Sequence, residues 1–94
     1  MKGLKCMKRE AQVVVTDEVG LHVRTAAAFA GEAQKYDSKV KVYYKGKAAD
    51  AKSMLSIMTL GVKCGEQINI MADGTDAEKA VEHLKRFVEN NFEN

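Results

Sequence analysis

The alternation of apolar and polar residues over 39–44 constrains the fold of this chain more than any other feature. The stretch Lys-Val-Lys-Val-Tyr-Tyr places both valines and Tyr44 on one face of a strand and the lysines on the other. The dipeptide Lys45-Gly46 then predicts a tight turn into a short, weaker strand over 47–51. We therefore expect an antiparallel sheet with one face packed on a core and the other face in water.

Further strands and helices are predicted on both sides of this hairpin. Val and Thr dominate residues 12–16, and residues 67–72 alternate again, which predicts a strand at each place. Apolar residues at helical spacing predict a helix over 23–36. One or two turns of helix are expected within 53–61, where Ser53 begins the element and a glycine closes it.

The last predicted helix has the clearest start signal. Thr75 and Glu78 have the spacing of a capping box, which predicts that the helix begins between them. The apolar residues that follow form one stripe: Ala77, Ala80, Val81, Leu84, Phe87 and Val88. His83 falls off that stripe among charged residues, so we expect it to be a solvated surface residue.

These elements follow one another in the order β-α-β-β-α-β-α, and 94 residues suffice for one domain. Each strand is apolar on one face, and the helices are enough to cover that face only. We therefore expect an α+β open-faced β-sandwich, a four-stranded antiparallel sheet with three helices on one face. We assign residues 9–94 to the domain and residues 1–8 to an N-terminal extension.

The composition argues against several classes of function. Lys and Arg number 15 and Asp and Glu 13, and the basic residues form no block, so nucleic-acid binding is not expected. No apolar run approaches the length of about 18 residues that a membrane span needs, and residues 1–8 lack the apolar core of a signal peptide. Cys6 and Cys64 belong to no Cys/His cluster, so we expect no metal, no cofactor and reduced thiols in the cytoplasm.

A phosphate site is predicted where the first helix begins, in Gly20-Leu21-His22-Val23-Arg24-Thr25-Ala26. Backbone N–H groups at a helix start have no intrahelical partner, and with the helix dipole they attract anions. Arg24 adds a planar fork that fits phosphate, and a neutral imidazole at His22 can accept a phosphoryl group on a ring nitrogen. The alternative is that His22 merely caps the helix and Arg24 is solvated, because isolated H-x-R tripeptides are common.

The short helix within 53–61 is unusually apolar. Its apolar residues cannot all face inward from so short a segment, so some of Met54, Leu55 and Met58 should be exposed. Exposed Met and Leu side chains suit the docking of a partner. Each of them could instead fill a gap in the core.

Four motifs occur in a fixed order along the chain. They are Gly20-Leu21-His22-Val23-Arg24, Lys35-Tyr36-Asp37, Lys-Ser-Met-Leu-Ser-Ile-Met-Thr-Leu-Gly over 52–61, and Gly65-Glu66. Together they resemble the HPr family, the histidine-containing phosphocarrier proteins of the bacterial phosphoenolpyruvate:sugar phosphotransferase system. The resemblance extends from about Arg9 to Asn91, and its spacing agrees with the elements predicted above.

The resemblance implies a role for each motif. Nδ1 of His22 would accept a phosphoryl group from phosphorylated enzyme I and pass it to the A domain of a sugar-specific enzyme II, with Arg24 holding the phosphoryl group. Ser53 stands where many members carry a regulatory serine that an HPr kinase/phosphorylase modifies. Ser53 would also be a good N-cap for the short helix, and the two roles are compatible.

The resemblance also implies a surface on which enzyme I and enzyme II dock. Its residues in this chain are Thr25, Phe29, Met54, Leu55 and Met58. Thr25 departs from the family, which usually has proline in this first helical turn. Because its backbone N–H and its hydroxyl could each contact a phosphate on His22, we expect the site to survive the change.

Two regulatory functions remain as alternatives. One is a nitrogen-branch carrier that signals without moving sugar, and the other is a co-regulator that acts through Ser53 on a transcriptional regulator. Relatives of the second kind lack the histidine, so His22 argues against it. A further alternative function is that of an unrelated α+β module that binds nucleic acid. We expect the protein to be a monomer.

Overall fold

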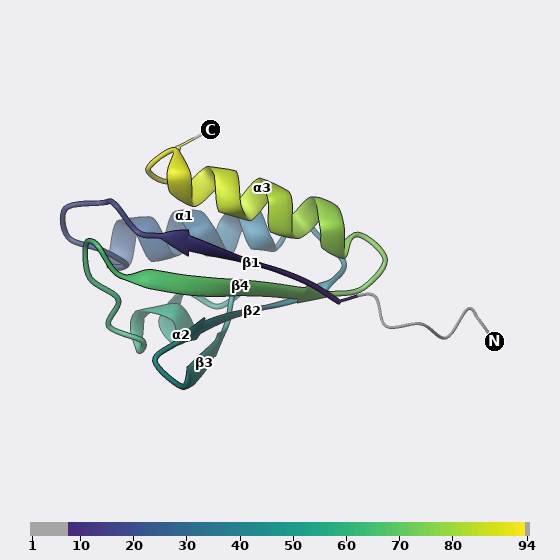
Figure 1. Cartoon of the computed structure of the whole chain (residues 1–94), viewed down its shortest axis with the longest axis horizontal. Coiled ribbons are helices and arrows are strands. Elements are labelled where there is room, and N and C mark those ends of the chain that lie inside the picture. Colours follow the sequence, from purple (N-terminus) through teal and green to yellow (C-terminus); the bar gives the residue numbers. More distant parts are fainter. Residues whose placement is uncertain (1–7, 94) are drawn as a thin grey trace.

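The computed structural model describes residues 8–93 and contains one antiparallel sheet of four strands in the order β1-β4-β2-β3 (Figure 1). The strands are β1 (Lys8–Val14), β2 (Lys39–Tyr44), β3 (Lys47–Asp50) and β4 (Gln67–Asp73). The helices are α1 (Val23–Ala33), α2 (Met54–Met58) and α3 (Ala77–Glu89). The observed element order and the antiparallel pairing confirm the fold expected from the sequence.

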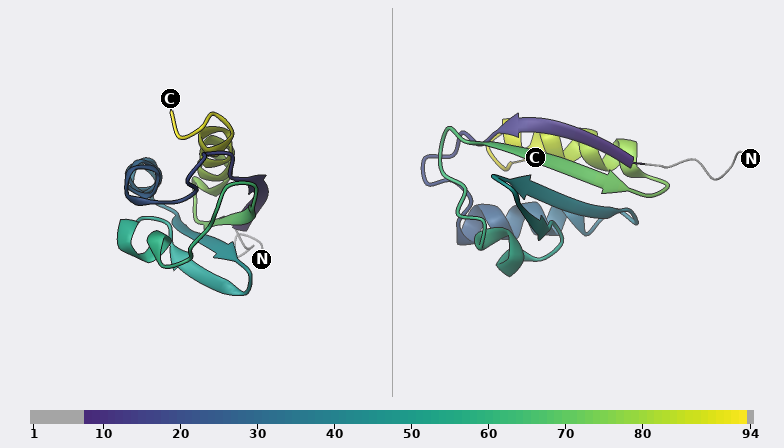
Figure 2. Two further views of the ribbon diagram at one scale, coloured as in Figure 1. Left: turned by 90° about the vertical axis from the view of Figure 1, so that its left-hand side faces the viewer. Right: turned by 60° about the horizontal axis from the view of Figure 1, so that its bottom comes forward.

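The helices lie on one face of the sheet and leave the other face open (Figure 2). Helix α3 packs over β1 and β4, and α2 lies beside α1. The core between sheet and helices contains the fully buried side chains of Phe29, Ile57, Ile68, Ile70, Leu84, Val15, Val40, Val42, Val62 and Val88. Within residues 8–93, none of the helices combines the length and the apolar run required to cross a membrane.

The hairpin of β2 and β3 forms as the alternation predicts. Val40, Val42 and Tyr44 are buried, and the lysines between them are exposed. Lys45 and Gly46 have φ values of 46° and 79°. A two-residue turn that follows the twist of the strands requires positive φ at both positions, which glycine adopts without strain.

The first strand lies earlier in the chain than predicted. It spans Lys8–Val14 instead of 12–16, because its pairing with β4 runs from Lys8 opposite Asp73 to Val14 opposite Gln67. Strand β1 therefore begins one residue before the domain boundary drawn at residue 9. Residues 1–7, which include Cys6, lie outside the described residues.

Two helix boundaries also differ from the prediction. Helix α1 ends at Ala33, where Gln34 is the C-cap, so Tyr36 lies beyond it. Helix α3 begins between Thr75 and Glu78 as predicted, but the capping box is wrong: the N-cap is Asp76, whose side chain makes no capping hydrogen bond. The Asp76 carboxylate instead accepts the hydrogen bonds of Asp37 N–H and Ser38 N–H, which tie the start of β2 to the start of α3.

Candidate functional site

His22 lies at the end of a loop that backbone contacts hold in place. Leu21 N–H donates to Val62 C=O over 3.0 Å, and the Leu21 side chain is buried. Gly20 has a φ of +87°, and a Cβ there would lie 2.3 Å from Val62 O. Only glycine allows this close approach with this backbone. The two loops meet at the end of the molecule where α1 begins (Figure 1).

The predicted anion site lies at the start of α1. His22 is the N-cap, with an extended backbone at φ −123° and ψ −167°. Its carbonyl accepts the first helical hydrogen bond, from Ala26 N–H at 2.7 Å. The amides of the first turn have no carbonyl one turn earlier to bind, and the helix dipole adds positive potential. An anion beside His22 would meet these donors.

Asp17, which follows the strand predicted over 12–16, faces both residues of the predicted phosphate site. Its Oδ2 lies 3.3 Å from Nε2 of His22, and its Oδ1 lies 3.0 Å from Nη2 of Arg24. Oδ2 also accepts the Val19 N–H at 3.1 Å. The Asp17 side chain is only 8% exposed. No spacing rule joins residues five and seven positions apart across a loop, so the sequence held no signal for this cluster.

The surroundings of Asp17 favour its charged form. Burial by itself would raise the pKa of this carboxyl group. The hydrogen bond from Val19 N–H and the charge of Arg24 act in the opposite direction, and His22 adds to them. The pKa of Asp17 is consequently lowered, which keeps a carboxylate beside the imidazole and the guanidinium near neutral pH.

The contact with Asp17 distinguishes the two ring nitrogens of His22. A carboxylate can only accept hydrogen bonds, so Nε2 is the nitrogen that carries the proton in this arrangement. In the neutral ring, Nδ1 then keeps its lone pair. The nitrogen that the family resemblance assigns to the phosphoryl group is thus the one that the geometry leaves nucleophilic.

Arg24 stands beside this imidazole and reaches solvent. Its side chain is 60% exposed, and its contact with Asp17 uses the single nitrogen Nη2. A guanidinium has five N–H donors in a plane, so one such contact leaves an edge for a phosphate.

Thr25 and Phe29, which were expected on the docking surface, are buried with exposed fractions of 0% and 1%. The Thr25 hydroxyl donates to Gly20 C=O at 2.8 Å and receives the His22 N–H at 3.0 Å. It therefore caps the helix start from inside and is not available to a phosphate. Phe29 lies in the core because its position on α1 faces the sheet. The side chains of Thr25 and Phe29 therefore pack beneath the expected docking surface and are not part of it.

The exposed part of the expected docking surface is formed by α2. Leu55 is 70% exposed, while Met54 and Met58 are half-buried and pack against the core. Val19 and Val23 are 65% and 59% exposed on either side of His22. As the first residue of α1, Val23 lies on the exposed side of the helix. We call Val19, Val23, Met54, Leu55 and Met58 the apolar patch.

Ser53 is the N-cap of α2, as predicted. Its hydroxyl accepts the Ser56 N–H at 3.2 Å. The side chain of Gln34, at the C-cap of α1, donates to the backbone carbonyl of the preceding residue, Lys52. Ser53 therefore lies near the C-terminal end of α1 and His22 at its N-terminal end. An 11-residue helix is roughly 16 Å long, so the two positions do not touch.

The prediction that His83 is a solvated surface residue is wrong. Its side chain is 31% exposed, and Nε2 lies 3.2 Å from Oε1 of Glu32 on α1. Nδ1 is 2.5 Å from the hydroxyl of Tyr36. The ring also makes edge contacts with the rings of Tyr36 and Phe87. His83 thus joins α3 to the end of α1.

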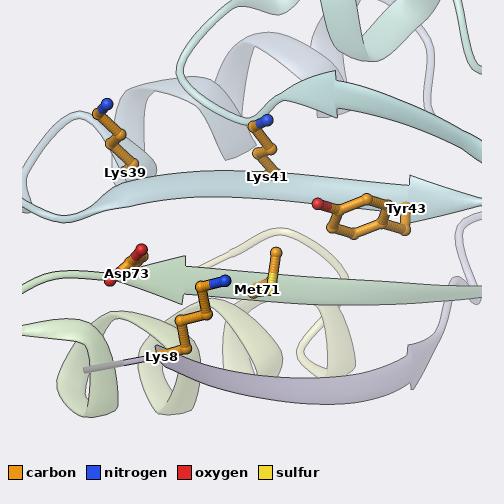
Figure 3. A pocket seen from close by; sticks show the side chains of 6 residues that line it. All are labelled: Lys8, Lys39, Lys41, Tyr43, Met71 and Asp73. Carbon is orange, nitrogen blue, oxygen red and sulfur yellow. The ribbon is translucent and has the colours of Figure 1, made fainter. Parts of the chain in front are cut away.

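The open face of the sheet carries a shallow hollow of about 200 Å³ (Figure 3). It is lined by Lys8, Lys39, Lys41, Tyr43, Met71 and Asp73. None of the site residues predicted from the sequence lines it, so it is separate from the phosphate site. Among residues 8–93 no group of His, Cys, Asp and Glu side chains has the arrangement of a metal site.

Comparisons with known sequences identify the family of this chain. The family model described as "PTS HPr component phosphorylation site" matches residues 9–90. Phosphocarrier protein HPr of Buchnera aphidicola is 47% identical over 73 residues, which are 78% of this chain and 86% of the relative. The HPr of Mycoplasma pneumoniae is 43% identical over 82 residues, 86% of this chain and 93% of the relative.

Solved structures show the same architecture. HPr from Thermoanaerobacter tengcongensis matches with a TM-score of 0.86 and 36% identity, covering 89% of this chain and 94% of the other. Crh of Bacillus subtilis, described as a catabolite repression protein in a dimer with a swapped domain, matches with a TM-score of 0.73 and 34% identity over 87% and 94% of the two chains. With sequence, fold and helix-start geometry in agreement, the chain belongs to the HPr family of phosphocarrier proteins of the phosphotransferase system.

Proposed function

We propose that this protein carries a phosphoryl group on Nδ1 of His22, taking it from phosphorylated enzyme I and passing it to enzyme II A domains that serve sugar uptake. The observation that carries the proposal is the arrangement at the start of α1. There His22 is the N-cap, Arg24 lies beside it, and Asp17 faces Nε2. The family resemblance implies that this exchange takes place in the cytoplasm.

The proposed chemistry needs only this chain and its phosphorylated donor. The lone pair of His22 Nδ1 attacks phosphorus, and a P–N bond forms. The bond between phosphorus and the donor breaks, and its electron pair stays on the donor. The amides of the first turn and the free edge of Arg24 are placed to stabilise the charge on the phosphoryl oxygens.

The apolar patch is the proposed docking surface for both partners. Its exposed Leu55 and Val23 lie on α2 and at the start of α1, so a partner seated there would cover His22. Exposed apolar side chains that are grouped in this way mark interaction sites more often than isolated ones do.

Incubation with enzyme I and labelled phosphoenolpyruvate tests the carrier function. We expect one phosphate per chain, labile in acid and stable in base, as a phosphohistidine is. Transfer of the label to a glucose-type and to a nitrogen-branch enzyme II A domain then separates sugar uptake from signalling. A protein that enzyme I leaves unlabelled would contradict the proposal.

We also propose that Ser53 is a regulatory phosphorylation site. A phosphate there would place about two negative charges on the apolar patch, beside Met54 and Leu55. The N-terminus of α2 tolerates the charge, so the fold should persist while docking weakens.

The variants Ser53→Asp and Ser53→Asn separate charge from capping, because Asp and Asn cap helices about equally well. We expect Ser53→Asp to raise the enzyme I concentration needed for half-maximal labelling several-fold and Ser53→Asn to leave it near that of the parent. Equal behaviour of the two variants would restrict Ser53 to helix capping.

The likeness to Crh supports a second candidate, a regulator that acts through the Ser53 surface without transferring phosphate. Labelling of His22 by enzyme I would contradict this second candidate. We further propose a monomer, to be checked by light scattering, although some structural relatives are dimers.

A further inference from the structure

Asp17 holds three hydrogen-bond donors with one nearly buried carboxylate. The donors are Val19 N–H, Nε2 of His22 and Nη2 of Arg24, at 3.1, 3.3 and 3.0 Å. The first contact anchors the carboxylate to its own loop, and the other two attach to it both residues of the proposed phosphate site. We infer that Asp17 is a positioning residue for phosphotransfer, an inference that rests on the proposed function of His22.

The contact with His22 acts on the imidazole in two ways. Before transfer it keeps the proton on Nε2 and so keeps the lone pair on Nδ1, where the P–N bond is to form. When Nδ1 attacks phosphorus, the ring becomes positively charged while Nε2 retains its proton. A carboxylate held at Nε2 stabilises that charge, and no proton has to move during the step.

The contact with Arg24 acts on the phosphoryl group. Arg24 is 60% exposed, and a long exposed side chain samples many rotamers. Its tie to Oδ1 through Nη2 alone keeps the guanidinium beside the imidazole with an edge unused. Arg24 therefore starts near the position in which it meets the phosphoryl oxygens, and less ordering is needed at the moment of transfer.

The loop that carries Asp17 is itself fixed from two sides. Asp17 C=O accepts the Gly20 N–H at 3.0 Å, and Gly20 packs against Val62 with no room for a side chain. The carboxylate is thus part of a rigid support, which is what positioning of a nucleophile requires. Glu18 lies next to it in sequence but is exposed, and it provides a matched control for the loss of one negative charge from the same loop.

The test compares the parent with Asp17→Asn, Asp17→Glu and Glu18→Gln. The first readout is the 15N spectrum of His22 in the unphosphorylated protein, which reports the tautomer. We expect the Nε2–H form in the parent and in Glu18→Gln. In Asp17→Asn the side-chain amide can donate as well as accept, so we expect a mixture of tautomers.

The second readout is the rate of labelling by phosphorylated enzyme I. We expect Asp17→Asn to be slower by roughly ten- to a hundredfold, the effect of losing a charge-assisted hydrogen bond. Asp17→Glu, which keeps the charge on a longer side chain, should recover part of the rate. The half-maximal enzyme I concentration should change little, because Asp17 lies behind the apolar patch.

Three outcomes overturn the inference. One is an Asp17→Asn protein with the tautomer and labelling rate of the parent, and another is an equal loss of rate in Glu18→Gln. The third outcome concerns an Asp17→Asn protein that labels slowly only because it melts at the assay temperature. In that case the inference is overturned if the folded Asp17→Glu protein labels no faster than Asp17→Asn. If the parent itself takes no label, the proposed function fails, whereas a labelled parent with a fully active Asp17→Asn removes only the role of Asp17.

Discussion

The two histidines of this protein have almost the same first neighbour but different places in the fold. Nε2 of His22 lies 3.3 Å from a carboxylate of Asp17, and Nε2 of His83 lies 3.2 Å from a carboxylate of Glu32. Both side chains are 31% exposed. A histidine paired with a carboxylate is therefore not enough to identify the phosphate acceptor in this molecule.

The other ring nitrogen and the backbone distinguish the two sites. Nδ1 of His83 is 2.5 Å from the hydroxyl of Tyr36, and His83 lies in the middle of α3, where helical hydrogen bonds use the amides. His22 is the N-cap of α1, beside the amides of the first helical turn and beside Arg24. From this comparison we propose that the helix start makes His22 the acceptor, whereas the same imidazole–carboxylate pair at His83 joins α3 to α1.

The variants His22→Ala and His83→Ala test this difference most directly. We expect His22→Ala to abolish labelling by enzyme I while the domain stays folded, because its side chain is outside the core. His83→Ala should keep the labelling rate and lose stability, since it removes contacts between α1 and α3. Label counting and thermal melting check both. Full labelling of His22→Ala would move the acceptor elsewhere.

Arg24→Lys tests what the helix start adds to the imidazole. We expect labelling to slow about tenfold, because an ammonium cannot make the bidentate contact of a guanidinium and the loss of about 1.4 kcal/mol corresponds to that factor. Arg86→Lys, on the exposed side of α3, is the matched control and should match the parent. Equal rates for the two variants would remove Arg24 from the site.

Tyr36→Phe asks whether freeing Nδ1 of His83 turns it into an acceptor. The hydroxyl contact is lost, and we expect the free energy of unfolding to fall by about 1 kcal/mol. His83 should still take no label, because no helix start lies beside it. Tyr43→Phe, on the open face of the sheet, controls for the loss of a hydroxyl (Figure 3). Label on His83 in Tyr36→Phe would show that a free Nδ1 suffices.

Glu66 braces the His22 end of the molecule, and its lowered pKa predicts a pH dependence of stability. Its carboxylate accepts hydrogen bonds from the Tyr44 hydroxyl and from Lys63 N–H, and it pairs with Lys45 at 3.0 Å. The hydrogen bond from Tyr44 contributes most to lowering the pKa of Glu66 from 4.5 to about 2. A lowered pKa means that the stabilisation is fully present above pH 4.5 and is lost as the pH falls toward 2.

We therefore expect Glu66→Gln to melt at a lower temperature than the parent at pH 7. Near pH 2, the pH that equals the lowered pKa of about 2, the two melting temperatures should approach each other. The Leu21 amide, which donates to Val62, should exchange faster in this variant, while the amides of α3 should not. Glu82→Gln, exposed on α3, is the control. A melting difference that persists at low pH would contradict the assignment.

The local sequence pattern predicted a helix or strand correctly where one physical signal, such as alternation or a helix cap, dominates the segment. The alternation over 39–44 predicted β2, and Ser53 before an apolar segment predicted the N-cap of α2. The first strand was misplaced, because Lys8 to Ala11 owe their strand conformation to pairing with β4 and not to their own propensities. The N-cap of α3 was misplaced by one residue, and the side chain of the observed N-cap, Asp76, binds Asp37 and Ser38, which lie 38 or more residues away.

The sequence by itself determined the fold class and the helix start at His22 and Arg24, where we propose the phosphate site, since periodicity and helix ends are local properties of the chain. Only the tertiary structure decided that Asp17 faces His22, that Thr25 and Phe29 lie beneath the surface, and that His83 joins two helices. These facts depend on which loops and helices meet in space. Such contacts arise from packing between distant segments, and no spacing along the chain encodes them.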